Sequence, residues 1–280
     1  MRMLAYTFET SLQFSEPVSD HSFVLRCLPK STNTQKVMQA QVFTDPPVQL
    51  SEQMDGFGNR IASGYCPVEH GAFSFYASGL AMVEPDDTES TPGHPMFLQM
   101  TPLTAPSDAM RELAEEEAVA AGWTRTADDT DRSERPVLVN ALVDRLCARV
   151  HEAFSYEPGA TDTTTTAAEA FDLGRGVCQD YAHVLISLCR LLGIQARYVT
   201  GLMVGEGASH AWVEVHDGVR WRGFDPTNNC PADDRYLLFA TGRDFEDCPI
   251  ERGVFRGSAE QVQIVSASVG DEASAMVQRG

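Results

Sequence analysis

Apolar and polar residues alternate along the first third of the chain. Between residues 7 and 15, Phe8, Leu12 and Phe14 are separated by polar side chains, and this period of two is typical of a half-buried strand. The same reasoning predicts strands at residues 22–28, 39–43 and 72–77. The turn-forming segment 55–60 indicates a hairpin. The first 83 residues are therefore predicted to be β-rich, and they contain no cluster of titratable side chains.

A helical period replaces the alternation in the middle of the chain. Residues 84–96 are acidic and rich in Pro, Ser and Thr, which predicts a linker. Beyond it, Ser107 is a suitable N-cap for a helix that extends to Ala121. Pro136 opens a second helix, and one face of it is predicted to carry Leu138, Leu142, Leu146 and Val150. The polar segments 126–134 and 161–166 are predicted to be loops.

The second half of the chain predicts one helix followed by an antiparallel sheet. A glycine-flanked loop at residues 174–177 leads into a helix at 178–192, and Gly193 closes that helix. Three strands are predicted at residues 196–202, 210–216 and 221–225, with Asp217 and Gly218 forming the turn between the second and third. A helix packed on an antiparallel sheet is an α+β arrangement.

Composition and charge place the chain among soluble globular proteins. Hydrophobic residues make up 43% and charged residues 22%, and no apolar run approaches the roughly 18 residues of a membrane helix. The first residues lack the apolar region of a secretion signal, so a cytoplasmic location is expected. The net charge of −19 disfavours nucleic acid and anionic membranes as partners. It is typical of a solvated, soluble surface, and a cationic substrate is the alternative interpretation.

One of the seven cysteines stands at a position suited to chemistry. The cysteines are scattered and form no CxxC pair, which argues against a disulfide framework and a zinc site. Cys178 lies where the glycine-flanked loop becomes a helix. A helix N-terminus favours the thiolate, and its free N–H groups can hold a developing oxyanion. Cys178 is therefore the candidate nucleophile.

A base and an orienting acid can be placed beside this thiol. His210 begins a strand after a glycine-rich loop, where an imidazole can meet both a thiol and a substrate. A third group must hold the imidazole in its tautomer. If residues 210–216 and 221–225 form a hairpin, Asp225 comes opposite His210 or nearly so. The pattern thus predicts a triad of Cys178, His210 and Asp225.

Several segments in this order resemble the bacterial transglutaminase-like superfamily of cysteine proteases. They are residues 176–182, 193–201, 210–215 and 224–228. The Cys, His and Asp of that family's triad match Cys178, His210 and Asp225. The resemblance extends to Tyr156–Gly159, to residues 236–253 and to the first 83 residues, so it covers nearly the whole chain. Gln195 is a departure, because many members of the family have proline there.

The resemblance implies an N-terminal β-sandwich-like domain followed by a transglutaminase-like, papain-type α+β domain. The expected boundaries are a β domain at 1–83, a linker at 84–96, a catalytic domain at 97–257, and a strand and tail at 258–280. It implies thiol-dependent acyl transfer at an amide or isopeptide bond of a peptide or protein, without metal or cofactor. Hydrolysis is favoured because water is the default acceptor. A transamidating transglutaminase, a small-molecule or cell-wall amidase and a non-catalytic peptide-binding scaffold remain as alternatives.

Other polar and aromatic residues near the triad are weaker candidates. Gln179 can donate to an oxyanion, Tyr156 can place its hydroxyl in the oxyanion hole, and Trp212 can shield the ion pair from water. Exposure or ordinary packing explains each of them equally well. Asp180 is expected to stabilise the N-terminus of the helix, and His183 is expected to be a core or surface histidine.

Overall fold

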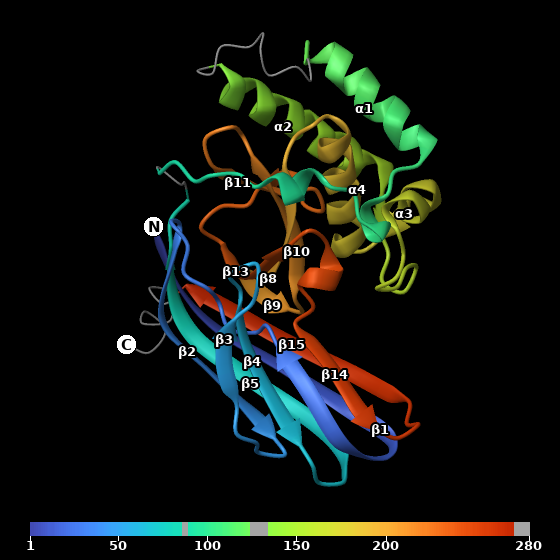
Figure 1. The fold of residues 1–280 in the computed structure, drawn as a ribbon. Helices are drawn as coiled ribbons and strands as arrows, with labels where there is room; N and C mark the ends of the chain where they lie inside the picture. The colour runs from blue at the N-terminus through green and yellow to red at the C-terminus, as the bar shows by residue number, and fades with distance from the viewer. Residues whose placement is uncertain (86–88, 124–133, 272–280) are drawn as a thin grey trace.

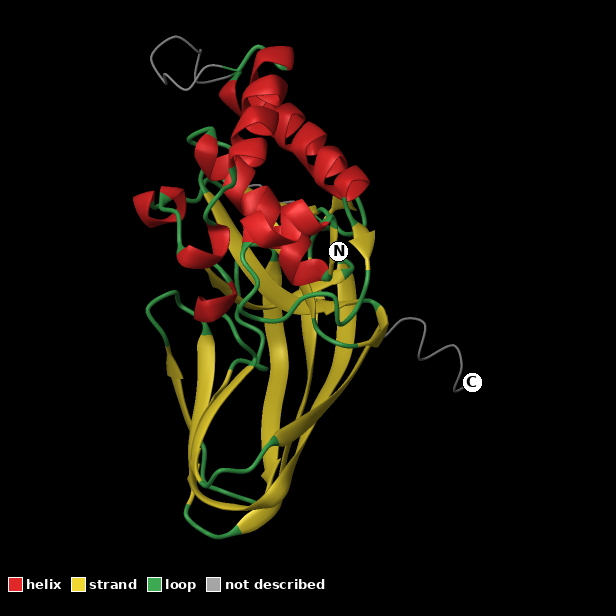
Figure 2. Cartoon of the chain, turned by 90° about the vertical axis from the view of Figure 1, so that its right-hand side faces the viewer, coloured by secondary structure: helices red, strands yellow, loops and turns green. Residues whose placement is uncertain are grey.

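The computed structural model describes residues 1–85, 89–123 and 134–271. Strands form one end of the molecule, helices cover the other end, and a second sheet lies between them (Figures 1 and 2). The fold is α+β, as the sequence predicts. Within the described ranges, no helix is long and apolar enough to cross a membrane.

A single long strand organises the N-terminal domain. Strand β1 (Arg2–Leu25) is continuous, whereas the sequence predicts separate strands at residues 7–15 and 22–28. The first half of β1 pairs with β5 (His70–Val83) and β15 (Gln261–Asp271). Its last residues pair with β4 (Arg60–Cys66) and β14 (Glu251–Arg256). Because shifts in register separate the two halves, β1 passes from one layer of a sandwich to the other.

The remaining strands of this domain lie at its edges. Strand β2 (Gln35–Asp45) pairs with β5, and β9 (Gly205–Gly207) pairs with β15. Strand β3 (Ser51–Met54) pairs with β4 across the turn that the sequence predicts at residues 55–60. Asp55 closes that turn by accepting hydrogen bonds from the N–H groups of Phe57 and Asn59.

The end of the chain returns to the N-terminal domain. Strands β14 and β15 lie alongside β1 (Figure 1), although the sequence analysis places residues 251–256 in the catalytic domain. The alternate residues Glu251, Gly253 and Phe255 are less exposed than their neighbours, because they face the inside of the sandwich. We therefore propose that the N-terminal domain comprises residues 1–83 together with the last two strands.

Within the part of the chain that the structure describes, four α-helices pack around the second sheet. They are α1 (Asp108–Ala120), α2 (Arg135–Ala153), α3 (Ala167–Leu173) and α4 (Cys178–Leu191). Short 3₁₀ turns occur at η1 (Pro95–Leu98), η2 (Pro102–Thr104) and η3 (Phe245–Asp247). Ser107 caps α1 as predicted. In α2 three residues of the predicted face, Leu142, Leu146 and Val150, are buried and Leu138 is exposed. The buried face also includes Val139, Val143 and Cys147.

The second sheet connects the two halves of the molecule. Its strand order is β12 (Cys230–Pro231), β11 (Trp221–Asp225), β10 (His210–His216), β8 (Ala196–Met203) and β13 (Tyr236–Gly242). Ala211, Val213 and Val215 share one hydrophobic core with helix α4. Leu202 and Phe239 share the other core with the inward side chains of β1. The sheet is thus held between the helices and the sandwich.

Candidate active site

The loop before Cys178 is fixed by a buried carboxylate. Oδ2 of Asp180 accepts hydrogen bonds of 2.7 Å from the N–H of Val177 and from the hydroxyl of Thr161. A β-carbon at Gly176 would lie 2.3 Å from the same oxygen, so only glycine fits there. Asp180 therefore anchors the loop, in addition to standing in the first turn of the helix where an acid is favoured.

Cys178 is the first residue of α4 and is partly exposed. The short strands β6 (Ser155–Tyr156) and β7 (Arg175–Gly176) pair just ahead of it and lead the chain into the helix. The first backbone hydrogen bonds to the carbonyl of Val177 come from Asp180 and Tyr181. The N–H groups of Cys178 and Gln179 precede these bonds, so they are available to an oxyanion.

His210 and Asp225 are in direct contact. Nε2 of His210 lies 2.7 Å from Oδ2 of Asp225, which is fully buried. The hairpin pairing ends with Val213 opposite Phe224, so Asp225 would come opposite Trp212. The two residues meet diagonally on one face of the sheet, two positions away from a directly opposed pair.

Several donors converge on the carboxylate of Asp225. Oδ1 accepts from the N–H groups of Thr227 and Asn228 at 2.9 and 3.1 Å. Oδ2 accepts from the amide of Asn228 at 2.7 Å and from the hydroxyl of Tyr236 at 2.8 Å. Burial raises the pKa of Asp225, but the bonds from His210, Asn228 and Tyr236 outweigh it and leave the pKa lowered. The carboxylate is therefore held in its charged form.

Asn228 and Tyr236, two of the donors to Asp225, differ in how far the sequence points to them. Asn228 belongs to the segment 224–228 that carries the family resemblance, although its role is not apparent there. Tyr236 is missed altogether, because it lies on β13 and reaches Asp225 only through the fold. No pattern near Tyr236 in the sequence points to that contact.

The imidazole of His210 is linked to Cys178 as well as to Asp225. Burial lowers the pKa of His210, but the hydrogen bonds and charges of Asp225 and Cys178 raise it to about 10. Since Nε2 is bonded to Asp225, Nδ1 is the nitrogen left for the sulfur. This arrangement favours the imidazolium form of His210 at neutral pH.

Cys178 and His210 line a cavity of about 340 Å³ together with Gln179 and Tyr156. The amide of Gln179 donates to the carbonyl of Thr163 at 3.4 Å. Tyr156 is 57% exposed, and both burial and the charge of Cys178 raise its pKa. Of the predicted triad, Cys178 and His210 lie at the cavity wall, whereas Asp225 is buried behind them.

The sandwich supplies part of the same cavity. Phe8 and Thr10 of β1 and Gln263 and Val265 of β15 line it opposite the helical domain. The N-terminal domain thus borders the candidate site without supplying Cys178, His210 or Asp225. The strands that form this wall come from both ends of the chain.

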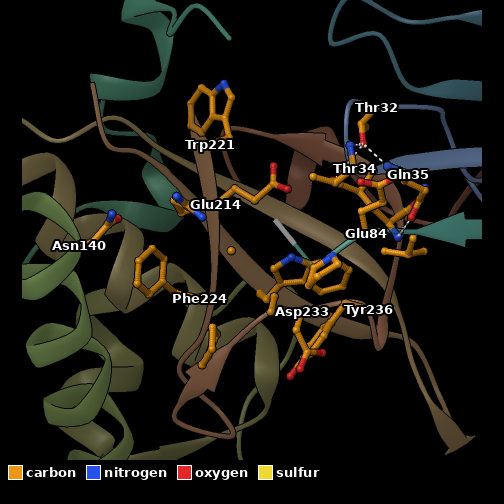
Figure 3. A pocket seen from close by; sticks show the side chains of 18 residues that line it. Thr32, Thr34, Gln35, Glu84, Asn140, Glu214, Trp221, Phe224, Asp233 and Tyr236 are labelled. Carbon is orange, nitrogen blue, oxygen red and sulfur yellow. Dashed lines mark hydrogen bonds between the residues drawn. The ribbon is translucent and has the colours of Figure 1, made fainter. Parts of the chain in front are cut away.

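Trp212 packs behind the imidazole. Its ring is stacked on His210 with centroids 6.3 Å apart, and it contacts the ring of Tyr236 edge-on at 5.3 Å. Trp212 and Tyr236 line a second cavity of about 220 Å³, shown in Figure 3. The indole thus lies against one side of the imidazole and is not part of the wall that holds Cys178.

His183 and Cys230 lie outside the wall that holds Cys178 and His210. His183 is fully buried, its Nε2 accepts the N–H of Phe245 at 3.2 Å, and burial lowers its pKa to about 3. Cys230 is partly exposed and lies 3.5 Å from the hydroxyl of Tyr236. The other five cysteines are buried.

Comparisons with known proteins agree with this architecture. Residues 124–226 match the transglutaminase-like superfamily, and residues 4–82 match the bacterial transglutaminase-like N-terminal region. Uncharacterized proteins of Mycobacterium tuberculosis and Mycobacterium leprae are 27% and 26% identical over 293 and 258 residues. The alignments cover 94% and 89% of this chain and 90% and 91% of the relatives.

A solved structure shares the fold across both domains. It is that of a "Putative Cysteine Protease" from Cytophaga hutchinsonii, with a TM-score of 0.75 and 22% identity. The match covers 96% of this chain and 91% of that one. At this level of identity the likeness concerns the fold. The chain belongs to the transglutaminase-like superfamily and carries its bacterial N-terminal region.

Proposed function

We propose that this protein catalyses thiol-dependent acyl transfer at an amide bond of a peptide or protein, with hydrolysis as the outcome. The observation that carries the proposal is the position of His210. Its ring is bonded to the buried Asp225 through Nε2, and it interacts with Cys178 at the wall of a cavity. Nucleophile, base and orienting acid in this relation are the parts that acyl transfer requires.

The reaction follows from the roles of these groups. The Cys178 thiolate attacks the carbonyl carbon, and the oxyanion that forms is held by the N–H groups at the start of α4. The imidazolium of His210 gives its proton to the departing amine as the C–N bond breaks. A thioester remains on Cys178. His210 then removes a proton from water, which attacks the thioester and releases the acid and the thiolate.

Hydrolysis is proposed over transamidation because of access to the thiol. Cys178 is partly exposed rather than enclosed, so bulk water can reach a thioester there. Both outcomes use the same groups and differ only in the acceptor. Proton transfer by a positioned acid or base raises the rate of such reactions by ~10²–10⁴-fold.

The proposal is tested by product analysis with a panel of peptide amides. The purified protein is incubated with each peptide in the presence and absence of an added primary amine, and acid and amide products are separated by mass. The proposal expects acid products that Cys178→Ala does not form. Predominant amine adducts would assign the transamidase instead. No product from any peptide, with Cys178 inert to electrophiles, would favour the binding scaffold.

A further inference from the structure

The catalytic cavity contains a carboxylate that acyl transfer does not use. Glu251, the first residue of β14, lines the cavity that also holds Cys178 and His210. Among the lining residues that the structure describes, it alone carries a carboxylate. No salt bridge or side-chain hydrogen bond joins it to another described residue. Burial raises the pKa of Glu251, with no cation acting against that rise.

The neighbours of Glu251 do not neutralise it. A β-carbon on Gly253 would lie 2.8 Å from Oε1 of Glu251 and 2.6 Å from Nε2 of His21. The carboxylate thus extends over a glycine, toward the inside of the sandwich. Burial and the neighbouring His70 lower the pKa of His21 to about 4, so His21 is uncharged at neutral pH. A half-buried charge without a partner is unfavourable unless a ligand supplies one.

A second unpartnered group lies in the same cavity. Thr10 of β1 is 1% exposed, and its hydroxyl has no hydrogen-bond partner. It lies opposite Val265 of β15, which also lines the cavity. Buried hydroxyls are nearly always hydrogen-bonded. The sandwich therefore contributes an unused hydroxyl and an unused carboxylate to a wall that is otherwise largely apolar.

We propose that Glu251 and Thr10 form a subsite for a positively charged group of the substrate. Resting on the proposed function, this assigns as substrates peptides with an ammonium or guanidinium group near the scissile amide. The carboxylate pairs with the cation, and the hydroxyl accepts an N–H. The net charge of −19 attracts such peptides from a distance. A lysine side chain, an arginine side chain and a free amino terminus all supply this chemistry.

The subsite can be tested by binding, without turnover. In the Cys178→Ala protein, equilibrium binding is measured for acetylated, amidated pentapeptides whose central residue is lysine, arginine or norleucine. The fourth peptide has norleucine at its centre and a free amino terminus. We expect at least one cationic peptide to bind about 10-fold more tightly than blocked norleucine, which corresponds to one charge-assisted hydrogen bond.

Two second-site variants identify the group responsible. Glu251→Gln should abolish the preference for the cation. Glu9→Gln, which removes an equal charge from the outer face of β1, should keep it. Thr10→Val is a nearly isosteric change that removes a buried unpaired hydroxyl. It should weaken binding of the cationic peptide a few-fold, and circular dichroism should show that the fold is retained.

The outcomes separate the subsite from the chemistry. Equal or undetectable binding of cationic and norleucine peptides overturns the subsite, and so does a preference that survives Glu251→Gln. A preference that depends on Glu251 supports it. If that preference is found while the wild-type protein hydrolyses none of the peptides, the subsite stands and the proposed hydrolysis fails.

Discussion

The imidazole of His210 and the carboxylate of Asp225 meet diagonally across the hairpin of β10 and β11, with 2.7 Å between Nε2 and Oδ2. Diagonal neighbours on one face of an antiparallel pair lie within reach of long side chains. The contact depends on the chain turning sharply after Asp225, where the N–H groups of Thr227 and Asn228 bond to Oδ1. The acid therefore ends its strand in a fixed position.

Replacing this acid by its amide should damage activity more than folding. We expect Asp225→Asn to lower kcat/KM by roughly 10-fold to ~10⁴-fold, because the charge is lost and the imidazole can take the wrong tautomer. Asp217→Asn is the control, since Asp217 is equally buried but caps the turn at the far end of the hairpin. A silent Asp225→Asn beside a damaging Asp217→Asn would show that the wrong acid has been assigned.

Local patterns predict the elements that carry the triad. The bounds of β10 and β11 match the prediction, and α4 begins at Cys178 as expected. These bounds can be predicted because glycine loops, a hairpin turn and alternating side chains are all features of neighbouring residues in the sequence. The period of α2 is also correct, and Leu142, Leu146 and Val150 of its predicted face are buried, whereas Leu138 is exposed.

Contacts between distant segments escape this kind of reasoning. Tyr236 reaches Asp225 from a strand on the other side of β8. Glu251 joins the cavity because β14 pairs with β1, more than two hundred residues earlier in the chain. Thr10 interrupts the apolar alternation of β1, and only the cavity explains why an inward position is polar. Such relationships are set by topology, not by local sequence.

The pH dependence of activity should report the raised pKa of His210. Although burial lowers that pKa, Asp225 and Cys178 raise it to about 10, so the imidazolium persists up to that pH. We expect kcat/KM to fall as the pH rises through about 10. The stability that this ion pair contributes is fully present below the ordinary pKa of 6.5 and is lost over the same alkaline range.

Whether the fall in kcat/KM at alkaline pH reports His210 can be checked by comparing the wild type with a variant. In Asp225→Asn the strongest group that raises the pKa of His210 is gone, so the alkaline limb should move to lower pH. Profiles of kcat/KM against pH for the two proteins give the answer. An alkaline limb at the same pH in both would mean that it reports another group.

The hydroxyl of Tyr236 should contribute to stability through Asp225. Tyr236→Phe removes one donor from a buried carboxylate, and we expect the free energy of unfolding at pH 7 to fall by about 1.5–3 kcal/mol. The lowered pKa of Asp225 means that this contribution is fully present above about pH 3.8. It is lost as the pH falls through the folded pKa.

A matched control exists on the surface. The hydroxyl of Tyr65 donates to Asp20 at 2.6 Å on an exposed part of the sandwich, and Tyr65→Phe should change stability by less than about 0.5 kcal/mol. Urea denaturation of the three proteins measures both effects. Equal losses in the two variants would show that burial of the acceptor is not what matters.

The catalytic half should not fold without the first strand. Removing residues 1–83 would uncover Leu202, Leu237 and Phe239 and leave β15 without β1. We therefore expect a fragment of residues 84–280 to aggregate or to lack cooperative thermal unfolding, as followed by circular dichroism. A soluble fragment with a sharp transition and full activity would contradict both the shared core and the role of the sandwich in the cavity.

The measurement closest to the central claim is competitive labelling of the thiols. The native protein is treated near pH 7 with limiting iodoacetamide, and the adducts are mapped by mass. Cys230 is the internal control, because it and Cys178 are both partly exposed while the other five cysteines are buried. We expect Cys178 to be labelled first in the wild type and in Cys230→Ala, and its labelling to slow markedly in His210→Ala. Faster labelling of Cys230, or labelling of Cys178 that is indifferent to His210, would contradict the account.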